Sequence, residues 1–178
     1  MEDLEKLKYP IGHFNCPENI SNEDIEKWIQ VLDVLPERLS NLVNSFSEEQ
    51  LNTPYRDGGW TVRQVIHHMA DSHHHSYTRF KWALTENRPL IKVYEEKLWS
   101  ELIDAKTAPI SLSLSYLTAL HAKLVYLLNH LDSVDFEKSY IHPEGSVNVS
   151  VAENIGKYAW HSNHHFAHIE NLALSKGW

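Results

Sequence analysis

The sequence predicts an all-α fold, a four-helix bundle with a small β-hairpin before the last helix. Four long segments repeat their apolar residues at helical spacing. Three of these segments begin at a capping signal, at Ser21, Thr61 and Ser150. The length of 178 residues suits one domain with a single continuous core, so we expect one bundle domain over residues 1–178.

The first long helix is expected to begin after Ser21, which acidic residues follow in the first turn. Apolar residues then recur at helical spacing from Ile25 to Leu42. Pro36 lies inside this run, and we expect it to kink or divide the helix because proline removes a backbone donor.

The elements that follow are delimited by capping residues, prolines and glycines. A short turn or helix at 47–50 and a loop at 53–59 precede the second long helix. Further helices are expected at residues 61–86, 94–103, 111–131 and 150–175. Residues 138–150 alternate polar and apolar side chains around a Pro-Glu-Gly sequence, which predicts the hairpin.

Composition excludes several classes of protein. Acidic residues outnumber basic ones by 24 to 16, a net charge of -8, which argues against nucleic-acid binding. No stretch approaches the roughly 18 uncharged apolar residues of a membrane span, and the N-terminus lacks the apolar region of a signal peptide. Cys16 is the single cysteine, so no intrachain disulfide can form. We therefore expect a cytoplasmic protein that binds neither nucleic acid nor membrane.

Histidine is the compositional outlier. Nine of the 13 histidines lie in two clusters, one in the second long helix and one in the last. The clusters consist of His67, His68, His73, His74 and His75, and of His161, His164, His165 and His168. Histidine is the commonest metal ligand, so the clusters raise the question of a metal site.

Helical geometry selects among these histidines. At about 100° per residue, His161 and His165 form an i, i+4 pair on the flank of the apolar face, while His164 lies further toward solvent. On the second helix, His68 lies on a flank of the apolar face and His67 lies opposite that face. Flank positions of two helices can converge between the helices of a bundle. His68, His161 and His165 are therefore candidates for a three-histidine site with an open fourth position.

Other interpretations of these residues stay open on spacing alone. His73 lies at the centre of the apolar face, where it could compete as a ligand, and a core histidine bonded to one neighbour explains it equally well. A pair of histidines four residues apart also suits a pH-sensitive helix or a polar one. Asp71, one turn beyond His68, is a weak candidate for a general base, and an exposed helical carboxylate explains it as well.

Two segments carry a family resemblance. TPYRDGGWTVRQVIHHMADSH (53–73) and YAWHSNHHFAHI (158–169) resemble the YfiT-like proteins of the DinB superfamily, small bacterial four-helix bundles described as metal-dependent hydrolases. The resemblance extends over essentially the whole chain, through YPIG (9–12), KWIQVL (27–32) and the final Gly-Trp.

The resemblance implies particular ligands. In the family, a metal-binding histidine follows eight residues after a tryptophan that opens the second helix, which here is His68 after Trp60. Two more ligands come from an H-x-x-x-H sequence after Tyr-x-Trp, which here are His161 and His165. The family also implies one zinc or nickel ion per chain and a cytoplasmic homodimer. The added His74 and His75 depart from the pattern and are not expected to be ligands.

Three functions are compatible with such a site. Three neutral imidazoles leave a divalent ion its full charge, so that it can activate a bound water for hydrolysis of a small-molecule substrate. The same ion could hold a thiol as thiolate, as in the bacillithiol S-transferases of this superfamily. A site closed by a fourth ligand, for which His73 and His168 are candidates, would instead indicate a non-catalytic metal-binding stress protein. The sequence leaves the substrate unassigned.

Overall fold

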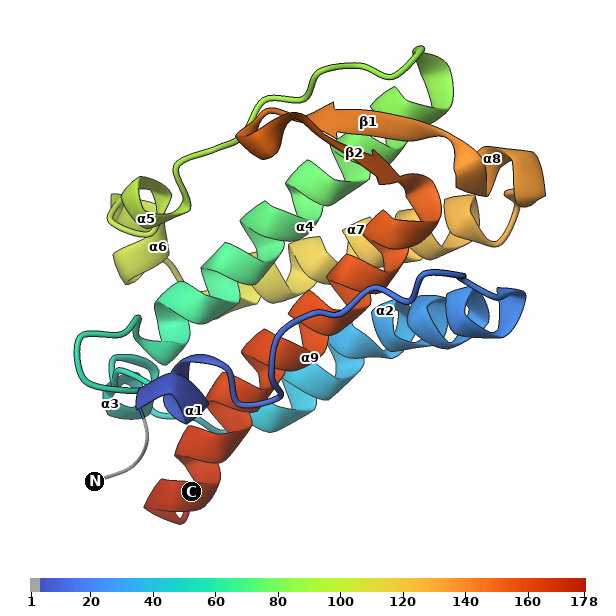
Figure 1. Cartoon of the computed structure of the whole chain (residues 1–178). Coiled ribbons are helices and arrows are strands. Elements are labelled where there is room, and N and C mark those ends of the chain that lie inside the picture. Colours follow the sequence, from blue (N-terminus) through green and yellow to red (C-terminus); the bar gives the residue numbers. More distant parts are fainter. Residues whose placement is uncertain (1–3) are drawn as a thin grey trace.

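Four long helices form the body of the protein, which a computed structural model describes from residue 4 to residue 178 (Figure 1). They are α2 (Asn22–Val43), α4 (Val62–Thr85), α7 (Ile110–Leu128) and α9 (Val151–Lys176). Both α2 and α4 pack against α7 and α9. Consecutive helices α2 and α4 therefore lie across the bundle from each other, and the predicted four-helix bundle is confirmed.

Capping residues fix the helix ends where the sequence predicts them. Ser21 and Thr61 each form a reciprocal capping box with the residue three positions later. The side chain of Ser150 accepts a hydrogen bond from the backbone N–H three residues later and so begins α9. Gly177 ends α9 in the left-handed conformation, with a φ of 70°, which glycine adopts without strain.

Helix α2 continues through Pro36 as one helix, so of the two expected outcomes, a kink or a division, the division is wrong. Proline has no N–H to donate to the carbonyl of Leu32, four residues earlier. That carbonyl oxygen instead accepts a hydrogen bond of 2.6 Å from Nδ1 of His121 on α7. A side chain from a neighbouring helix thus replaces the missing backbone donor.

Within residues 4–178, α1 (Leu4–Lys8) precedes the first long helix, and four more short helices lie between the long ones: α3 (Glu48–Leu51), α5 (Glu96–Trp99), α6 (Ile103–Thr107) and α8 (Ser133–Glu137). The single amphipathic helix predicted at 94–103 is wrong, because α5 and α6 are separate. Leu98 and Leu102 are 64% and 54% exposed, so they do not form an apolar face against the bundle.

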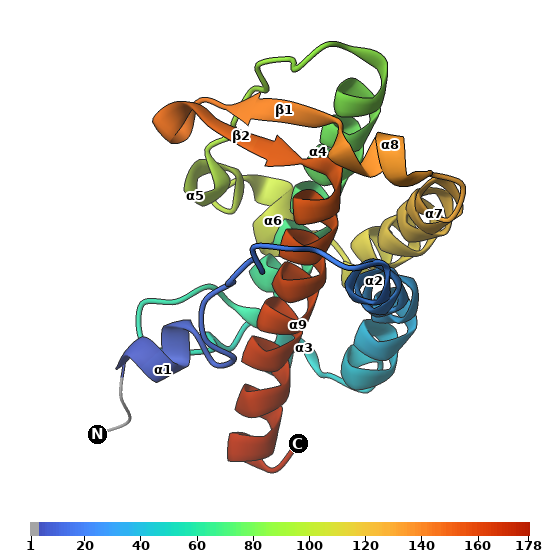
Figure 2. The ribbon, with the colours of Figure 1, turned by 45° about the vertical axis from the view of Figure 1, so that its right-hand side comes forward.

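The predicted hairpin is present. Strands β1 (Ser139–His142) and β2 (Val147–Ser150) pair antiparallel, and the 3-10 turn η1 (Glu144–Ser146) joins them. Figure 2 shows the hairpin lying across the ends of α4 and α9. Tyr140 and Val149 are buried on its inner face and extend the core.

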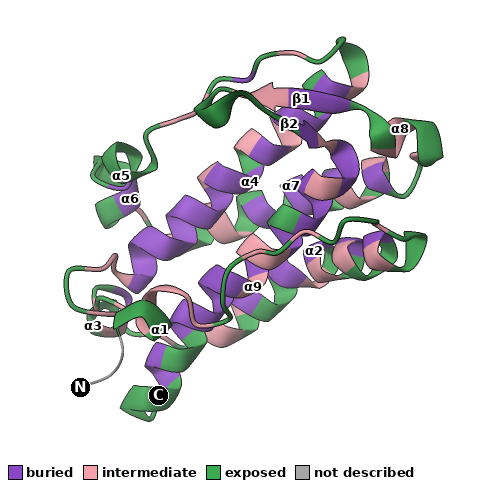
Figure 3. Ribbon diagram, in the orientation of Figure 1, coloured by how far each residue is buried: buried purple, intermediate pink, exposed green. Residues whose placement is uncertain are grey.

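The apolar core forms two clusters. One cluster contains Leu32, Phe80 and Leu124. The other contains Leu35, Met69 and Leu117. Along α4 and α7, His73 and His121 separate the clusters, and these two histidines are 0% and 1% exposed. Figure 3 shows the buried residues continuing along α4 and α9 through this polar layer.

Helix α7 is more apolar than we expected of any segment, because no stretch was expected to approach the composition of a membrane span. Among residues 4–178 it is the one helix whose length and composition would suffice to cross a membrane. Leu117 and Leu124 are buried where α7 packs against α2 and α4, but only 22% of its most apolar window is buried. Its other face exposes Leu112, Tyr116 and Tyr126.

Candidate metal centre

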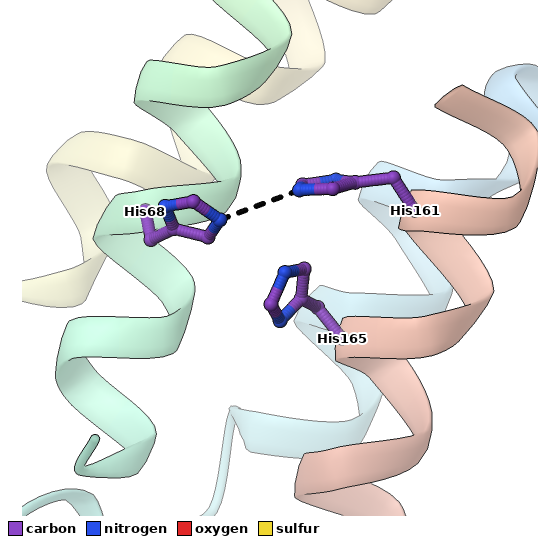
Figure 4. Close-up of side chains that lie close together, drawn as sticks. All are labelled: His68, His161 and His165. Atoms are coloured by element: carbon purple, nitrogen blue, oxygen red, sulfur yellow. Dashed lines mark hydrogen bonds between the residues drawn. The ribbon is translucent and has the colours of Figure 1, made fainter. Parts of the chain in front are cut away.

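The structure brings His68 of α4 together with His161 and His165 of α9. Each of the three offers a ring nitrogen, and these atoms all lie within 4.8 Å of one another. Figure 4 shows the rings turned toward one another between the two helices. Among the described residues no fourth histidine, cysteine or carboxylate joins this group, so an ion held there would keep a coordination position for another ligand.

The spacing of the nitrogens fits a small divalent cation. Nε2 of His68 lies 3.3 Å from Nε2 of His161. Zinc–nitrogen bonds of about 2.0–2.1 Å in tetrahedral geometry place two ligand nitrogens roughly 3.3–3.4 Å apart. In the metal-free chain one of these two nitrogens carries the proton that joins them. A cation at this place would replace that proton.

A chain of hydrogen bonds fixes the tautomer of His161. The carbonyl oxygen of Leu32 can only accept, so Nδ1 of His121 is protonated and its Nε2 is an acceptor. Nδ1 of His73 therefore donates to Nε2 of His121 at 2.9 Å. Nε2 of His73 in turn accepts from Nδ1 of His161 at 3.2 Å. Neutral His161 is thus left with an unprotonated Nε2 that faces the site.

A second carbonyl fixes the tautomer of His165 in the same way. Nε2 of His168 donates to the carbonyl oxygen of Lys8 at 3.0 Å, so Nδ1 of His168 is an acceptor. Nδ1 of His165 lies 3.4 Å from it and is its donor. The lone pair of neutral His165 is therefore on Nε2. Metal-binding histidines characteristically donate their second ring N–H to such a partner.

Two aromatic side chains position His68. The Trp60 ring packs at 4.6 Å from the His68 ring, between centroids. The hydroxyl of Tyr94 lies 3.4 Å from Nδ1 of His68 and can exchange donor and acceptor roles with it. His68 can therefore shift its proton to Nδ1 and present Nε2 to a cation.

Burial keeps the three histidines neutral. Desolvation lowers the pKa of His68 to about 4, with a smaller contribution from His168. Desolvation likewise lowers the pKa values of His161 and His165 well below the usual value, and neighbouring histidines lower them further. All three are neutral imidazoles at pH 7, the form that binds a metal.

The N-terminal segment covers two histidines that were expected to be less buried. His164 stacks on Trp160, with ring centroids 4.5 Å apart, and Tyr9 lies beside it. His168 is held by the Lys8 carbonyl and by stacking on Tyr55. The expectation that His164 lies toward solvent is therefore wrong, because a segment distant in sequence packs over this face.

His164, His165 and His168 form a second group with ligand-like spacing, and this group shares His165 with the first. All three of its members come from α9. Nε2 of His168 is bonded to a backbone carbonyl and its Nδ1 to His165, so neither nitrogen of His168 is free. In the first group, in contrast, the outer nitrogens of His161 and His165 are the bonded ones, and the Nε2 atoms of both face His68 of α4 (Figure 4).

The remaining histidines of the clusters have structural partners. His67 was expected opposite the apolar face, yet it is buried and bonds to Ser113 Oγ at 2.7 Å and to the Ala108 carbonyl at 3.1 Å. His74 is hydrogen bonded to the Tyr116 hydroxyl. His75 stacks on Tyr94, with ring centroids 4.2 Å apart.

Asp71 is half-buried and joins neither histidine group. Burial and, to a smaller extent, the charge of Asp104 raise the pKa of its carboxyl to about 6. Its role as a general base stays a prediction.

Sequence reasoning missed His121 and Tyr94. His121 interrupts the leucine face of α7 between Leu117 and Leu124, and this interruption could have marked it as a buried polar partner. Tyr94 lies in an irregular segment, where no periodicity points to its partner.

Two cavities adjoin the α9 members of the group. One of about 410 Å³ is lined by His161, Tyr158 and Trp160. The other, of about 690 Å³, is lined by His165 and Trp60. His161 and His165 therefore each border a cavity, whereas His68 lines neither.

Comparison with known proteins assigns the family. The model of the DinB superfamily matches residues 32–169. The chain belongs to the DinB superfamily. A relative from Bacillus subtilis, named "Putative metal-dependent hydrolase YfiT", is 49% identical over 97% of both chains. A relative from Oceanobacillus iheyensis with the same description is 50% identical over 96% of this chain and 98% of its own length.

A solved structure of the Bacillus subtilis YfiT superposes on this DinB-superfamily chain with a TM-score of 0.95, at 49% identity, over 97% of this chain and 99% of that one. That structure is described as "a probable metal-dependent hydrolase with an unusual four-helix bundle topology". The four-helix bundle of this chain agrees with this description.

Proposed function

We propose that the protein is a metal-dependent hydrolase of small molecules, with one divalent cation bound by His68, His161 and His165. The observation that carries the proposal is the pair of hydrogen-bond chains that end at the Leu32 and Lys8 carbonyls. They leave two Nε2 lone pairs turned toward one point, as metal ligation requires. The names of the relatives support the same conclusion.

A divalent cation held by three neutral imidazoles supplies Lewis acidity that polarises a substrate carbonyl and activates water near neutral pH. The protein's own residues orient the ligands, and the two cavities admit the substrate. A non-catalytic function is less well supported, because His73 bonds to the outer nitrogen of His161 and so does not close the site. Hydrolysis is preferred to thiol transfer because the relatives are named as hydrolases.

Zinc is the proposed metal and nickel the alternative. The three imidazole ligands suit both metals, and zinc is preferred because zinc sites with three histidines and an open fourth position are common in hydrolytic enzymes.

We also propose a cytoplasmic homodimer. The exposed face of α7, with Leu112, Tyr116 and Tyr126, supports an interface between two copies. Sedimentation of wild type and of Tyr126→Glu tests this proposal: we expect a dimer and a monomer, and a monomeric wild type would contradict it.

The hydrolase proposal is tested on metal-free protein reloaded with zinc or nickel. We expect reloading to restore hydrolysis in a panel of activated esters and amides, and His68→Ala to abolish it. His130→Ala is the control, because His130 is exposed and bonds to the Tyr126 carbonyl. If the protein conjugates a thiol to an electrophile and cleaves no ester or amide, the hydrolase proposal is wrong and thiol transfer takes its place.

A further inference from the structure

The 410 Å³ cavity beside His161 is also lined by a buried arginine, Arg79. Arg79 of α4 lines this cavity together with His161. Tyr158 connects the two: its hydroxyl accepts from Nη1 of Arg79 at 3.4 Å, and its ring lies 5.4 Å from the His161 ring, between centroids. A molecule that reaches the metal centre from this side therefore meets the Arg79 guanidinium.

Arg79 is a buried cation without a counter-ion. Arg79 is only 6% exposed. Among residues 4–178 no carboxylate forms an ion pair with it, and its Nε has no hydrogen-bond partner. Its partners are the hydroxyls of Tyr158 and Tyr140. Because a buried charge is costly without an opposite charge, this arrangement indicates that the compensating anion comes from a ligand.

A second positive charge lies at the same cavity, because Lys157 also lines it. His142 lines it as a neutral imidazole: burial lowers the pKa of His142, and the nearby positive charges of Lys157 and Arg79 lower it as well.

Glutamates limit the charge of the ligand. Glu95, Glu96 and Glu144 line the cavity but are exposed, so water screens them. Their presence favours a ligand with a single negative charge over a phosphate dianion.

We propose that this cavity binds the carboxylate of a small-molecule substrate at Arg79, with the scissile ester or amide bond toward His161. This inference rests on the proposed hydrolase function and names its substrate class. The planar guanidinium of Arg79, which lines the cavity, matches a carboxylate through two parallel hydrogen bonds. Lys157 adds attraction at the exposed side of the cavity.

The test is a binding titration by NMR on the full chain, both metal-free and zinc-loaded. The probes are N-acetylglycine, its neutral amide N-acetylglycinamide, and inorganic phosphate. We expect N-acetylglycine to bind more tightly than the amide, and Arg79→Met to weaken its binding by about tenfold or more. Arg88→Met is the matched control, because Arg88 is exposed, bonds to Asn148 and does not line the cavity. Lys157→Met, at an exposed position, gives a second variant should Arg79→Met fail to fold, and we expect a smaller loss.

The results separate the two proposals. Zinc content, measured on the same samples, should be unchanged in Arg79→Met. Carboxylate binding without zinc retention would overturn the metal centre and leave the carboxylate site standing. Equal binding of acid and amide, no saturable binding of the acid, or unchanged affinity in a folded Arg79→Met protein would overturn the carboxylate site. If phosphate binds more tightly than N-acetylglycine, the ligand group recognised at Arg79 is a phosphate and the carboxylate proposal is wrong.

Discussion

Replacement of His73 by phenylalanine tests the hydrogen-bond chain behind the metal centre. His73 accepts from Nδ1 of His161 and donates to Nε2 of His121. Phenylalanine fills a similar volume without nitrogen, so His161 loses the acceptor that fixes its tautomer. Removal of such an outer partner typically weakens metal binding by about 10–100-fold. We expect a loss of zinc affinity in this range.

The same change also lowers stability. Two buried groups lose their partners, the Nδ1–H of His161 and Nε2 of His121. Each unsatisfied group costs about 1–3 kcal/mol, so the free energy of unfolding of the metal-free protein should fall by roughly 2–6 kcal/mol. His73→Gln should restore part of both losses, because the amide offers an acceptor and a donor.

Three assays read out the effects of His73→Phe. Competition with a chromogenic chelator gives the zinc affinity, urea titration gives the free energy of unfolding, and ¹⁵N NMR of the imidazoles gives the tautomer of His161. His130→Phe is the control, since it removes an exposed histidine distant from the chain of hydrogen bonds. A folded His73→Phe protein with wild-type zinc affinity and an unchanged His161 tautomer would refute the reasoning.

Three further predictions follow from the core and from shifted pKa values. Leu124→Ala should lower the free energy of unfolding by about 2–5 kcal/mol in urea titrations, with zinc content unchanged, because Leu124 is fully buried away from the ligands. The metal-free protein should lose stability as pH falls below about 6.5: burial lowers the pKa of His121, so the unfolded chain binds the proton and the folded chain does not. Urea titrations at several pH values check this, and stability rising on acidification would contradict it. The Cys16 thiol, whose pKa is raised by burial and by Glu153, should react slowly with a disulfide reagent at pH 7, and Glu153→Gln should accelerate the reaction.

The sequence predicts best where local chemistry decides. Capping residues at Ser21 and Thr61 and the glycine stop at Gly177 act within a few residues, so the helix ends were predictable. Helical geometry also places His161 and His165 on one flank of α9. To predict that His68 meets these two histidines, it was enough to assume that α4 and α9 are neighbours in the bundle.

The failures come from contacts between distant segments. His164 is buried because the N-terminal segment packs over α9, which the periodicity of α9 does not encode. Helix α2 stays undivided at Pro36 because His121 of another helix satisfies the Leu32 carbonyl. Arg79 of α4 is buried beside Tyr158 of α9 and Tyr140 of the hairpin, which are contacts that the sequence of α4 alone does not encode.

Metal content per chain tests the central claim most directly. The measurement is elemental analysis of zinc-loaded wild type, His161→Ala and His164→Ala, since the two histidine groups share His165, whereas His161 belongs only to the first and His164 only to the second. We predict one zinc per chain in wild type and in His164→Ala, and none in His161→Ala. Zinc retained by His161→Ala and lost from His164→Ala, or absent from wild type, would contradict the account.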